Sequence, residues 1–93
     1  MPSDKALIVS VRGRVQGVGF RYWTVRQADA LGLKGWVRNE PDGSVTALVG
    51  GADDAVTKML DLFWTGPRSA SVASVTIEPA NPLALPASFT EIR

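Results

Sequence analysis

The sequence predicts an α+β fold in which two helices pack on one face of an antiparallel sheet. Segments that alternate apolar and polar residues, which are typical of half-buried strands, flank two segments of helical periodicity. The order that results is strand–helix–strand, twice in succession. Two such units interleave into a two-layer sandwich, the ferredoxin-like βαββαβ architecture.

The first unit covers the N-terminal part of the chain. Residues 6–12 alternate strongly apolar side chains with a second, mixed set, which predicts a strand. A helix is predicted from about residue 22 to residue 31, with Gly32 as its C-terminal stop. Residues 35–39 form the second predicted strand.

The second unit begins at a turn, because Pro41-Asp42-Gly43 combines a preset proline φ with a glycine that tolerates positive φ. A third strand is predicted at 44–49 and an amphipathic helix at 53–63. This helix has Asp53 and Asp54 in its first turn, where they favour the helix dipole. Its core face is formed by Val56, Met59, Leu60 and Phe63.

The remaining segments are less regular. A fourth strand is predicted at 73–77, and Pro79 stops it. Three prolines predict an extended, irregular segment after it, and residues 89–93 are predicted as a short closing strand. The whole chain, 1–93, is expected to be a single domain.

Composition excludes several kinds of chemistry. The 93 residues include no histidine and no cysteine, so the usual general base, thiol nucleophile and zinc ligands are missing. No apolar run is long enough to span a bilayer, and the N-terminus lacks the layout of a secretory signal. We therefore expect a cytoplasmic protein. An enzyme of this composition must act by positioning and electrostatics.

Charge is distributed unevenly along the chain. Residues 1–40 contain seven basic and three acidic side chains, whereas the remainder contains three basic and six acidic ones. The basic half includes residues 13–21, Gly-Arg-Val-Gln-Gly-Val-Gly-Phe-Arg, which lie between a predicted strand and a predicted helix. Glycines let backbone N–H groups converge, a helix N-terminus adds positive potential, and arginine suits phosphate oxygens. The stretch is predicted to bind a small anion.

Topology relates this loop to a second polar residue. In the predicted fold the second strand runs parallel to the first, with the third between them, and the first helix packs on all three. Asn39, at the end of the second strand, could then approach the same end of the sheet as Arg21.

These stretches resemble the acylphosphatases. Residues 13–21 match the family's first signature at every specified position, and 35–39, followed by Gly43, Val45 and Gly51, match the second. The later part of the chain is also similar, at Trp64, Gly66, Pro67, Ala70, Val72 and the ending 89–92, so the resemblance covers nearly the whole chain. Two long signatures in the correct order and spacing are far more specific than one glycine-rich loop.

The resemblance implies hydrolysis of the carboxyl–phosphate bond of acyl phosphates, with no metal or cofactor. Arg21 would bind the phosphoryl oxygens, and Asn39 would orient the attacking water. Backbone N–H groups of the loop would share the phosphate binding, from Val15, Gln16, Gly17, Val18, Gly19 and Phe20. We expect a monomer that binds an acyl phosphate, releases inorganic phosphate, and engages neither nucleic acid nor membrane.

Secondary roles follow for the neighbouring residues. Gln16 is predicted to brace the loop by hydrogen bonds, and Phe20 to anchor it in the core. Arg14 and Arg38 could line the rim of the site or belong to the solvated surface. Tyr22, Trp23 and Trp36 are predicted to pack.

Three alternatives remain. The chain could be a non-catalytic anion-binding or regulatory module of the same fold. It could be the acylphosphatase-like domain of a larger hydrogenase-maturation carbamoyltransferase. RNA binding on the open sheet face is disfavoured, because the central strands offer no aromatic residue among Leu7, Val9, Val11, Val45, Ala47 and Val49.

Overall fold

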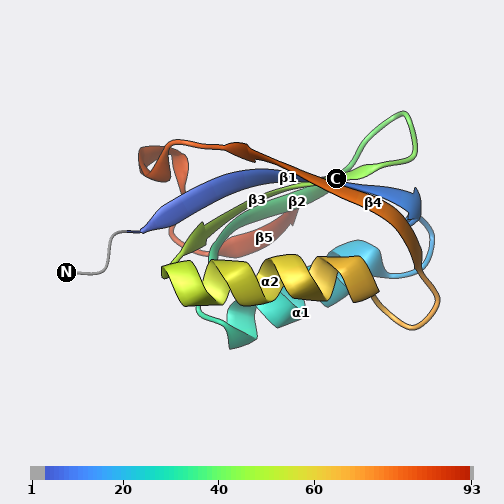
Figure 1. Ribbon diagram of the computed structural model, residues 1–93, viewed down its shortest axis with the longest axis horizontal. Helices are drawn as coiled ribbons and strands as arrows, with labels where there is room; N and C mark the ends of the chain where they lie inside the picture. The colour runs from blue at the N-terminus through green and yellow to red at the C-terminus, as the bar shows by residue number, and fades with distance from the viewer. Residues whose placement is uncertain (1–3, 93) are drawn as a thin grey trace.

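The computed structural model describes residues 4–92, in which two helices cover one face of a five-stranded sheet (Figure 1). The elements are β1 (Lys5–Arg14), α1 (Phe20–Ala30), β2 (Lys34–Asn39), β3 (Val45–Gly51), α2 (Asp53–Thr65), β4 (Ser71–Pro79), the 3-10 helix η1 (Pro82–Ala84) and β5 (Phe89–Ile92). The predicted ferredoxin-like order is confirmed, with β5 as a fifth strand. Residue 93, which the predicted closing strand included, lies outside the described residues.

The strands lie side by side in the order β4-β1-β3-β2-β5. β1 pairs antiparallel with β3, and β3 pairs antiparallel with β2, so β1 and β2 run parallel with β3 between them, as predicted. The four strands of the βαββαβ order pair antiparallel, as expected, and β5 adds one parallel pair with β2. β4 and β5 lie at opposite edges, and the segment between them carries the chain from one edge to the other.

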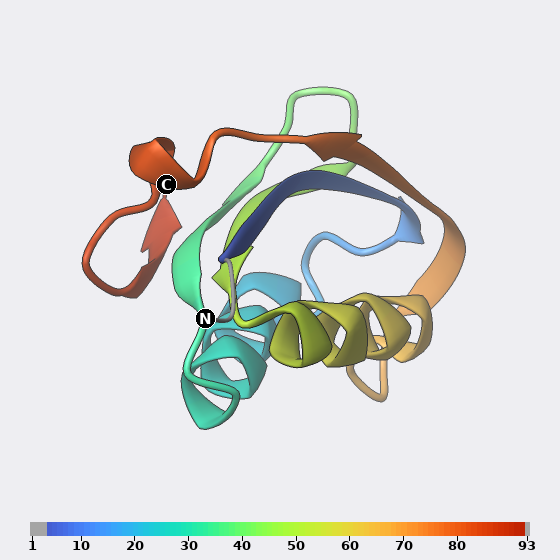
Figure 2. The same cartoon turned by 60° about the vertical axis from the view of Figure 1, so that its left-hand side comes forward.

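This connecting segment, residues 80–88, crosses one end of the open face, the face of the sheet opposite the helices (Figure 2). It is not irregular throughout. The side chain of Asn81 accepts a hydrogen bond from the Leu83 N–H at 3.0 Å and opens η1. Leu85 lies directly over β3, since its side chain occupies the place that a Cβ on Gly50 would take.

The boundaries around the glycine-rich stretch differ from the prediction. β1 continues through Arg14, so Gly13 and Arg14 belong to the sheet, and Gly13 pairs with Val72 after a register shift at Arg12/Gly13. Here β1 and β4 approach closely, because a Cβ on Gly13 would overlap the Ser71 carbonyl oxygen. α1 begins at Phe20, earlier than predicted. The connecting loop is therefore only residues 15–19.

The core lies between the helices and the sheet. α2 contributes Val56, Met59 and Phe63, which are fully buried as predicted. α2 packs on β4, β1 and β3, whereas α1 packs mainly on β2 and β5, so the prediction that α1 covers the first three strands is wrong. A helix about 10 Å wide cannot cover the whole width of a five-stranded sheet whose strands are ~4.8 Å apart, so the two helices divide the sheet between them.

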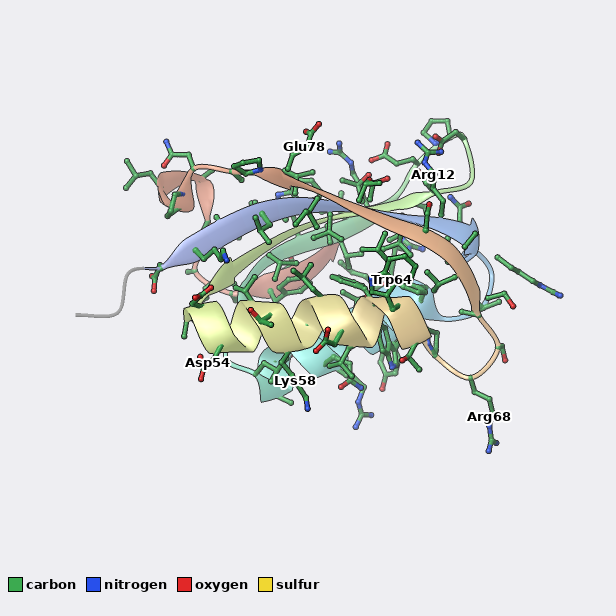
Figure 3. The ribbon with its side chains drawn as sticks, viewed as in Figure 1. Arg12, Asp54, Lys58, Trp64, Arg68 and Glu78 are labelled. Atoms are coloured by element: carbon green, nitrogen blue, oxygen red, sulfur yellow. The ribbon has the colours of Figure 1, made fainter. Side chains whose placement is uncertain are left out.

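The outer surface of α2 is polar. Asp54 and Lys58 project away from the sheet (Figure 3). Asp53 and Asp54 occupy the first turn, as predicted, and Asp53 accepts a hydrogen bond from Lys5 at 2.9 Å. Neither helix within residues 4–92 has the length and apolar character needed to cross a membrane.

Candidate active site

The loop of residues 15–19 is anchored at both ends. Val15 is 1% exposed and Phe20 is 2% exposed, and the Phe20 ring stacks on Phe63 of α2 at 6.2 Å. Between these anchors the backbone turns through two glycines in the left-handed region, Gly17 (φ 73°) and Gly19 (φ 76°). The predicted role of Phe20 as an anchor is confirmed.

The backbone N–H groups of this loop have no acceptor within the described part of the chain. Among residues 4–92, no hydrogen bond is donated by the N–H of any of residues 16–20. The first intrahelical bond runs from the Trp23 N–H to the Gly19 carbonyl, 3.0 Å. Donors in the first turn of a helix lack intrahelical partners and lie at its positive end. The loop thus offers several N–H donors to an external anion.

Gln16 ties this loop to the turn between β2 and β3. Its Nε2 donates to the carbonyl oxygens of Glu40 and Ser44, at 2.8 and 2.9 Å. Glu40 directly follows Asn39 along the chain. The predicted bracing role of Gln16 is confirmed, and its amide links the two halves of the candidate site.

The turn between β2 and β3 is internally bonded. The Glu40 N–H donates to the Ser44 carbonyl at 2.8 Å, and the Gly43 N–H donates to the Glu40 carbonyl at 3.1 Å. One Asp42 oxygen accepts from both the Ser44 hydroxyl (2.6 Å) and its N–H (2.9 Å). Mainly because of the Ser44 hydroxyl, the pKa of Asp42 falls to about 2. Asn39 therefore enters a well-defined turn.

Arg21 lies in the first turn of α1 and contacts the end of β5. Its Nη1 donates to the Ile92 carbonyl at 3.0 Å, and its Nε is 3.8 Å from Oε1 of Glu91. Ile92 pairs with Arg38, the residue before Asn39. Sequence reasoning missed both β5 partners of Arg21, since no local pattern relates residues so far apart; Ile92 is 71 positions from Arg21.

Asn39 ends β2 and is exposed. Side chains alternate along a strand, so Asn39 shares a face with Val37, which is fully buried under the helices. Asn39 is therefore on the helix side of the sheet. The structure brings Arg21, Asn39 and the loop to one end of the sheet.

Arg38 does not belong to this group. Alternation puts it on the open face, where its guanidinium lies 4.7 Å from the centre of the Trp36 ring. It also donates to Glu40 at 2.8 Å, and this bond, followed by one from Thr46, lowers the pKa of the Glu40 carboxyl. Arg14 is exposed at the end of β1, next to the loop.

Of the three aromatic residues predicted to pack, Trp23 does so against Phe20 and Phe63, with ring centres 5.3 and 6.4 Å away. Tyr22 is 60% exposed, so its predicted packing is wrong. Its hydroxyl accepts from Arg26 at 3.2 Å on the outer side of α1, and this bond raises the pKa of Arg26.

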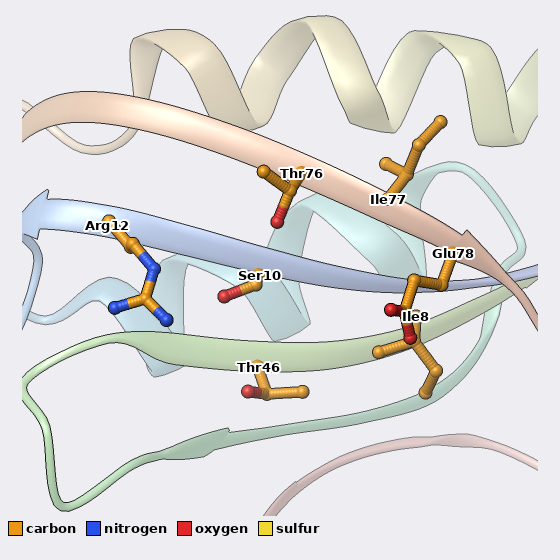
Figure 4. Close-up of a pocket in the computed structure, with 7 residues that line it drawn as sticks. All are labelled: Ile8, Ser10, Arg12, Thr46, Thr76, Ile77 and Glu78. Atoms are coloured by element: carbon orange, nitrogen blue, oxygen red, sulfur yellow. The ribbon is translucent and has the colours of Figure 1, made fainter.

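A shallow pocket of about 340 Å³ lies elsewhere, on the open face (Figure 4). A row of hydroxyls from three paired strands, Ser10, Thr46 and Thr76, runs between Arg12 at one end and Glu78 at the other. The residues that line this pocket do not include Arg21, Asn39 or any residue of the loop. We assign the candidate active site to the loop and not to this pocket.

The open face of the sheet carries different residues from the six strand residues that were used above to disfavour RNA binding. The strand residues without aromatic side chains are buried beneath the helices and do not face outward: Leu7, Val9, Val11, Val45, Ala47 and Val49. Their aliphatic character therefore says nothing about the open face. Trp36 is the aromatic residue that β1, β2 and β3 contribute to that face, and the Arg38 guanidinium covers its ring.

Comparison with known proteins identifies the family of the chain. The family model described as Acylphosphatase matches residues 7–90. The chain belongs to the acylphosphatase family. An acylphosphatase of Rhizobium meliloti (strain 1021) is 59% identical over 85 residues, which cover 91% of this chain and 90% of that protein. As an acylphosphatase, the chain is a hydrolase that acts on acid anhydrides.

Solved structures show the same family fold. The crystal structure of acylphosphatase from Bacillus subtilis superimposes with a TM-score of 0.90 at 32% identity, covering 95% of this chain and 98% of that one. The crystal structure of T. kodakarensis HypF matches with a TM-score of 0.84 at 27% identity, over 96% of this chain but 12% of that one. The acylphosphatase fold thus occurs both in chains of this length and within a much longer one.

Proposed function

We propose that this acylphosphatase hydrolyses the carboxyl–phosphate bond of acyl phosphates by phosphate binding and water orientation, without a metal. Arg21 and the backbone N–H groups of residues 15–20 bind the phosphoryl oxygens, and Asn39 orients the attacking water. The observation that carries the proposal is the set of N–H groups at residues 16–20 that have no acceptor among the described residues, in the loop that leads into Arg21.

The charge available at the site suits a phosphoryl group. Arginine supplies several donors in a planar fork, and the N-terminal end of α1 adds the partial positive charge of its first turn. These donors are held in place before substrate arrives, because Val15 and Phe20 are buried and Gln16 braces the loop. Preorganised donors of this kind stabilise charge without reorganising during the reaction.

The reaction needs few further groups from the protein. An acyl phosphate is a mixed anhydride with a good leaving group, so positioning and charge stabilisation supply most of what the reaction needs. The Asn39 amide can both donate to and accept from a water, but it is not a base at neutral pH. We therefore assign the water's proton to the substrate's own phosphate as the P–O bond to the carboxylate breaks.

The carboxylates near the site are already paired, which favours a reaction without metal. Glu40 and Asp42, the carboxylates nearest to Asn39 along the chain, are engaged by Arg38 and Arg12. Within residues 4–92, no three histidine, cysteine, aspartate or glutamate side chains come together as a metal-binding group.

The biological setting is part of the same proposal. We propose a cytoplasmic, monomeric, single-domain enzyme that binds a small acyl phosphate and releases inorganic phosphate. The match to the Rhizobium meliloti protein over 90% of that protein's length supports a free-standing enzyme over a domain of a larger carbamoyltransferase. A non-catalytic anion-binding module remains the alternative that a hydrolysis assay separates.

The test is release of benzoate from benzoyl phosphate in the presence of EDTA. Arg21→Ala is expected to weaken inorganic phosphate binding and to lower kcat/KM by about 10²–10³, the usual effect of removing one preorganised donor. Asn39→Ala is expected to lower kcat by a similar factor with phosphate binding nearly kept. Arg26→Ala, which removes an exposed arginine from the same helix, is the matched control and should behave as wild type.

Equal rates in wild type, Arg21→Ala and Asn39→Ala would overturn the assigned roles. Loss of wild-type activity in EDTA would overturn the metal-free reaction. Phosphate binding without hydrolysis would favour the regulatory module.

A further inference from the structure

Glu91 occupies a position in β5 where the strand pattern calls for an apolar residue. β5 pairs in parallel with β2, so that Phe89 lies opposite Gly35 and Glu91 opposite Val37. Phe89 is 5% exposed and Val37 is fully buried, both on the helix side of the sheet. Since side chains alternate along a strand, Glu91 is on that side too. A carboxylate therefore faces the layer that contains α1.

The charge partner of this carboxylate is Arg21. α1 packs against β5, and the Arg21 Nε lies 3.8 Å from Oε1 of Glu91. The same guanidinium donates through Nη1 to the Ile92 carbonyl at 3.0 Å. Two acceptors from neighbouring residues of β5 thus hold one arginine. The carbonyl is within hydrogen-bond distance, whereas the carboxylate is at the longer separation of an ion pair.

These two acceptors have different consequences for an anionic ligand. The Ile92 carbonyl is neutral, so it can orient the guanidinium while leaving its positive charge available. The Glu91 carboxylate is negative, partly cancels that charge, and repels any second anion that approaches Arg21. The Arg21 side chain is 29% exposed and that of Glu91 is 43% exposed, so solvent weakens the pair and a ligand can displace it.

We propose that Glu91 sets the phosphate affinity of the site by competing with the phosphoryl group for Arg21. This inference rests on the proposed function, in which Arg21 binds the phosphoryl oxygens. Substrate and inorganic phosphate present the same oxygens to Arg21, so Glu91 weakens the binding of both. Weaker binding of phosphate favours release of this product after hydrolysis. Glu91 is thus a positioning residue that acts through Arg21.

The experiment measures the inhibition constant of inorganic phosphate at low ionic strength in wild type and Glu91→Gln. The amide keeps the shape of the side chain and removes its charge. We expect phosphate to bind about threefold to tenfold more tightly, the size of one unit charge acting over about 4 Å through a medium as polar as water. The KM for benzoyl phosphate should fall in parallel. Added salt should shrink the difference, because the effect is one of charge.

The matched control is Glu78→Gln. Glu78 lies on β4, at the opposite edge of the sheet, and projects from the open side (Figure 3). The substitution removes the same charge from an edge strand far from Arg21, and the phosphate inhibition constant should equal that of wild type. The folded state of both variants is checked by their unfolding midpoints.

Unchanged or weaker phosphate binding in Glu91→Gln would overturn the inference, because a purely supporting role predicts one of these results. An equal change in both variants would overturn it as well, since only net charge would then matter. If wild type hydrolyses benzoyl phosphate and the phosphate inhibition constant of Glu91→Gln equals that of wild type, only the inference is overturned. A wild type that binds phosphate more weakly than Glu91→Gln in a direct calorimetric titration, but never hydrolyses benzoyl phosphate, overturns the proposed function alone.

Discussion

At the scale of single residues, glycines near the candidate site meet two different requirements. Gly13 is needed for conformation, because its φ of 132° is positive, and also for space, because a Cβ there would overlap the Ser71 carbonyl oxygen and lie 2.7 Å from the Ala73 nitrogen. Gly19 is needed for conformation, because its φ of 76° is left-handed while a Cβ would meet no atom within 4 Å. The close approach at Gly13 involves two strands, β1 and β4, whereas the φ of Gly19 concerns only the backbone of that residue.

This distinction predicts unequal effects of the same substitution. Gly19→Ala should cost about 1–2 kcal/mol of unfolding free energy, the penalty of a left-handed alanine. Gly13→Ala should cost more, because β1 and β4 must separate to admit the methyl group. Urea unfolding of both variants measures the difference. Equal losses would show that β4 shifts freely at this point.

At the scale of elements, the turn between β2 and β3 joins the two halves of the site. Gln16 bonds to this turn from the loop, and the turn itself is closed by Asp42 and Ser44. Arg12 of β1 also donates to Asp42, at 3.1 Å. The position of Asn39 therefore depends on contacts from β1, the loop and the turn together.

The pKa of Asp42 predicts how this turn responds to acid. Because the folded-state pKa is lowered from 3.8 to about 2, the charged carboxylate stabilises the folded state above pH 4, and this contribution is lost as the pH falls toward 2. Asp42→Asn should unfold at a lower temperature than wild type at pH 7, and the two proteins should converge as the pH approaches 2. Thermal unfolding across this range measures it.

Asp61→Asn, which removes an exposed carboxylate from α2, is the control for net charge. A gap between wild type and Asp42→Asn that stays constant from pH 7 to pH 2 would contradict the assigned cause.

At the scale of the whole molecule, one core supports both the fold and the site. Phe63 of α2 is fully buried and stacks on Phe20, which ends the loop and begins α1. Trp23 of α1 packs edge-on against the same Phe63 ring at 6.4 Å. This cluster joins the two helices directly beneath the loop.

Removing the centre of this cluster should destabilise the whole protein. Phe63→Ala is expected to cost about 3–5 kcal/mol, a large part of the ~5–15 kcal/mol that holds a typical domain folded. Trp64→Ala removes a larger but 54% exposed side chain from the next position, and should cost far less. Denaturant unfolding compares them. Similar losses would mean that the exposed tryptophan carries packing that its exposure does not reveal.

Local residue patterns predict an element well when its apolar residues all lie on the side that packs against the core. The amphipathic spacing of α2 predicts its buried residues because a helix that packs on a sheet must present one apolar side. The predicted start of α1 is too late, since glycines suggest a loop and Phe20 is held by a ring from α2. Long-range packing decides that boundary.

The residues of the candidate site likewise include some that local sequence predicts and some that it does not. Two signatures, each of them a continuous stretch of sequence, predict Arg21, Asn39 and the loop. They do not predict Glu91 and Ile92, because nothing local relates a short C-terminal strand to an arginine in the first helix. The contact of these two residues with Arg21 depends on the parallel pairing of β5 with β2.

By itself, then, the sequence determined the order of the elements, the family and the residues expected to bind phosphate and water, because periodicity, glycine placement and the signatures are local properties. The edge that β5 joins, the strands that each helix covers and the groups that hold Arg21 before a substrate arrives became known from the three-dimensional structure. These depend on strand pairing and on packing between segments distant in the chain, which local residue patterns do not specify.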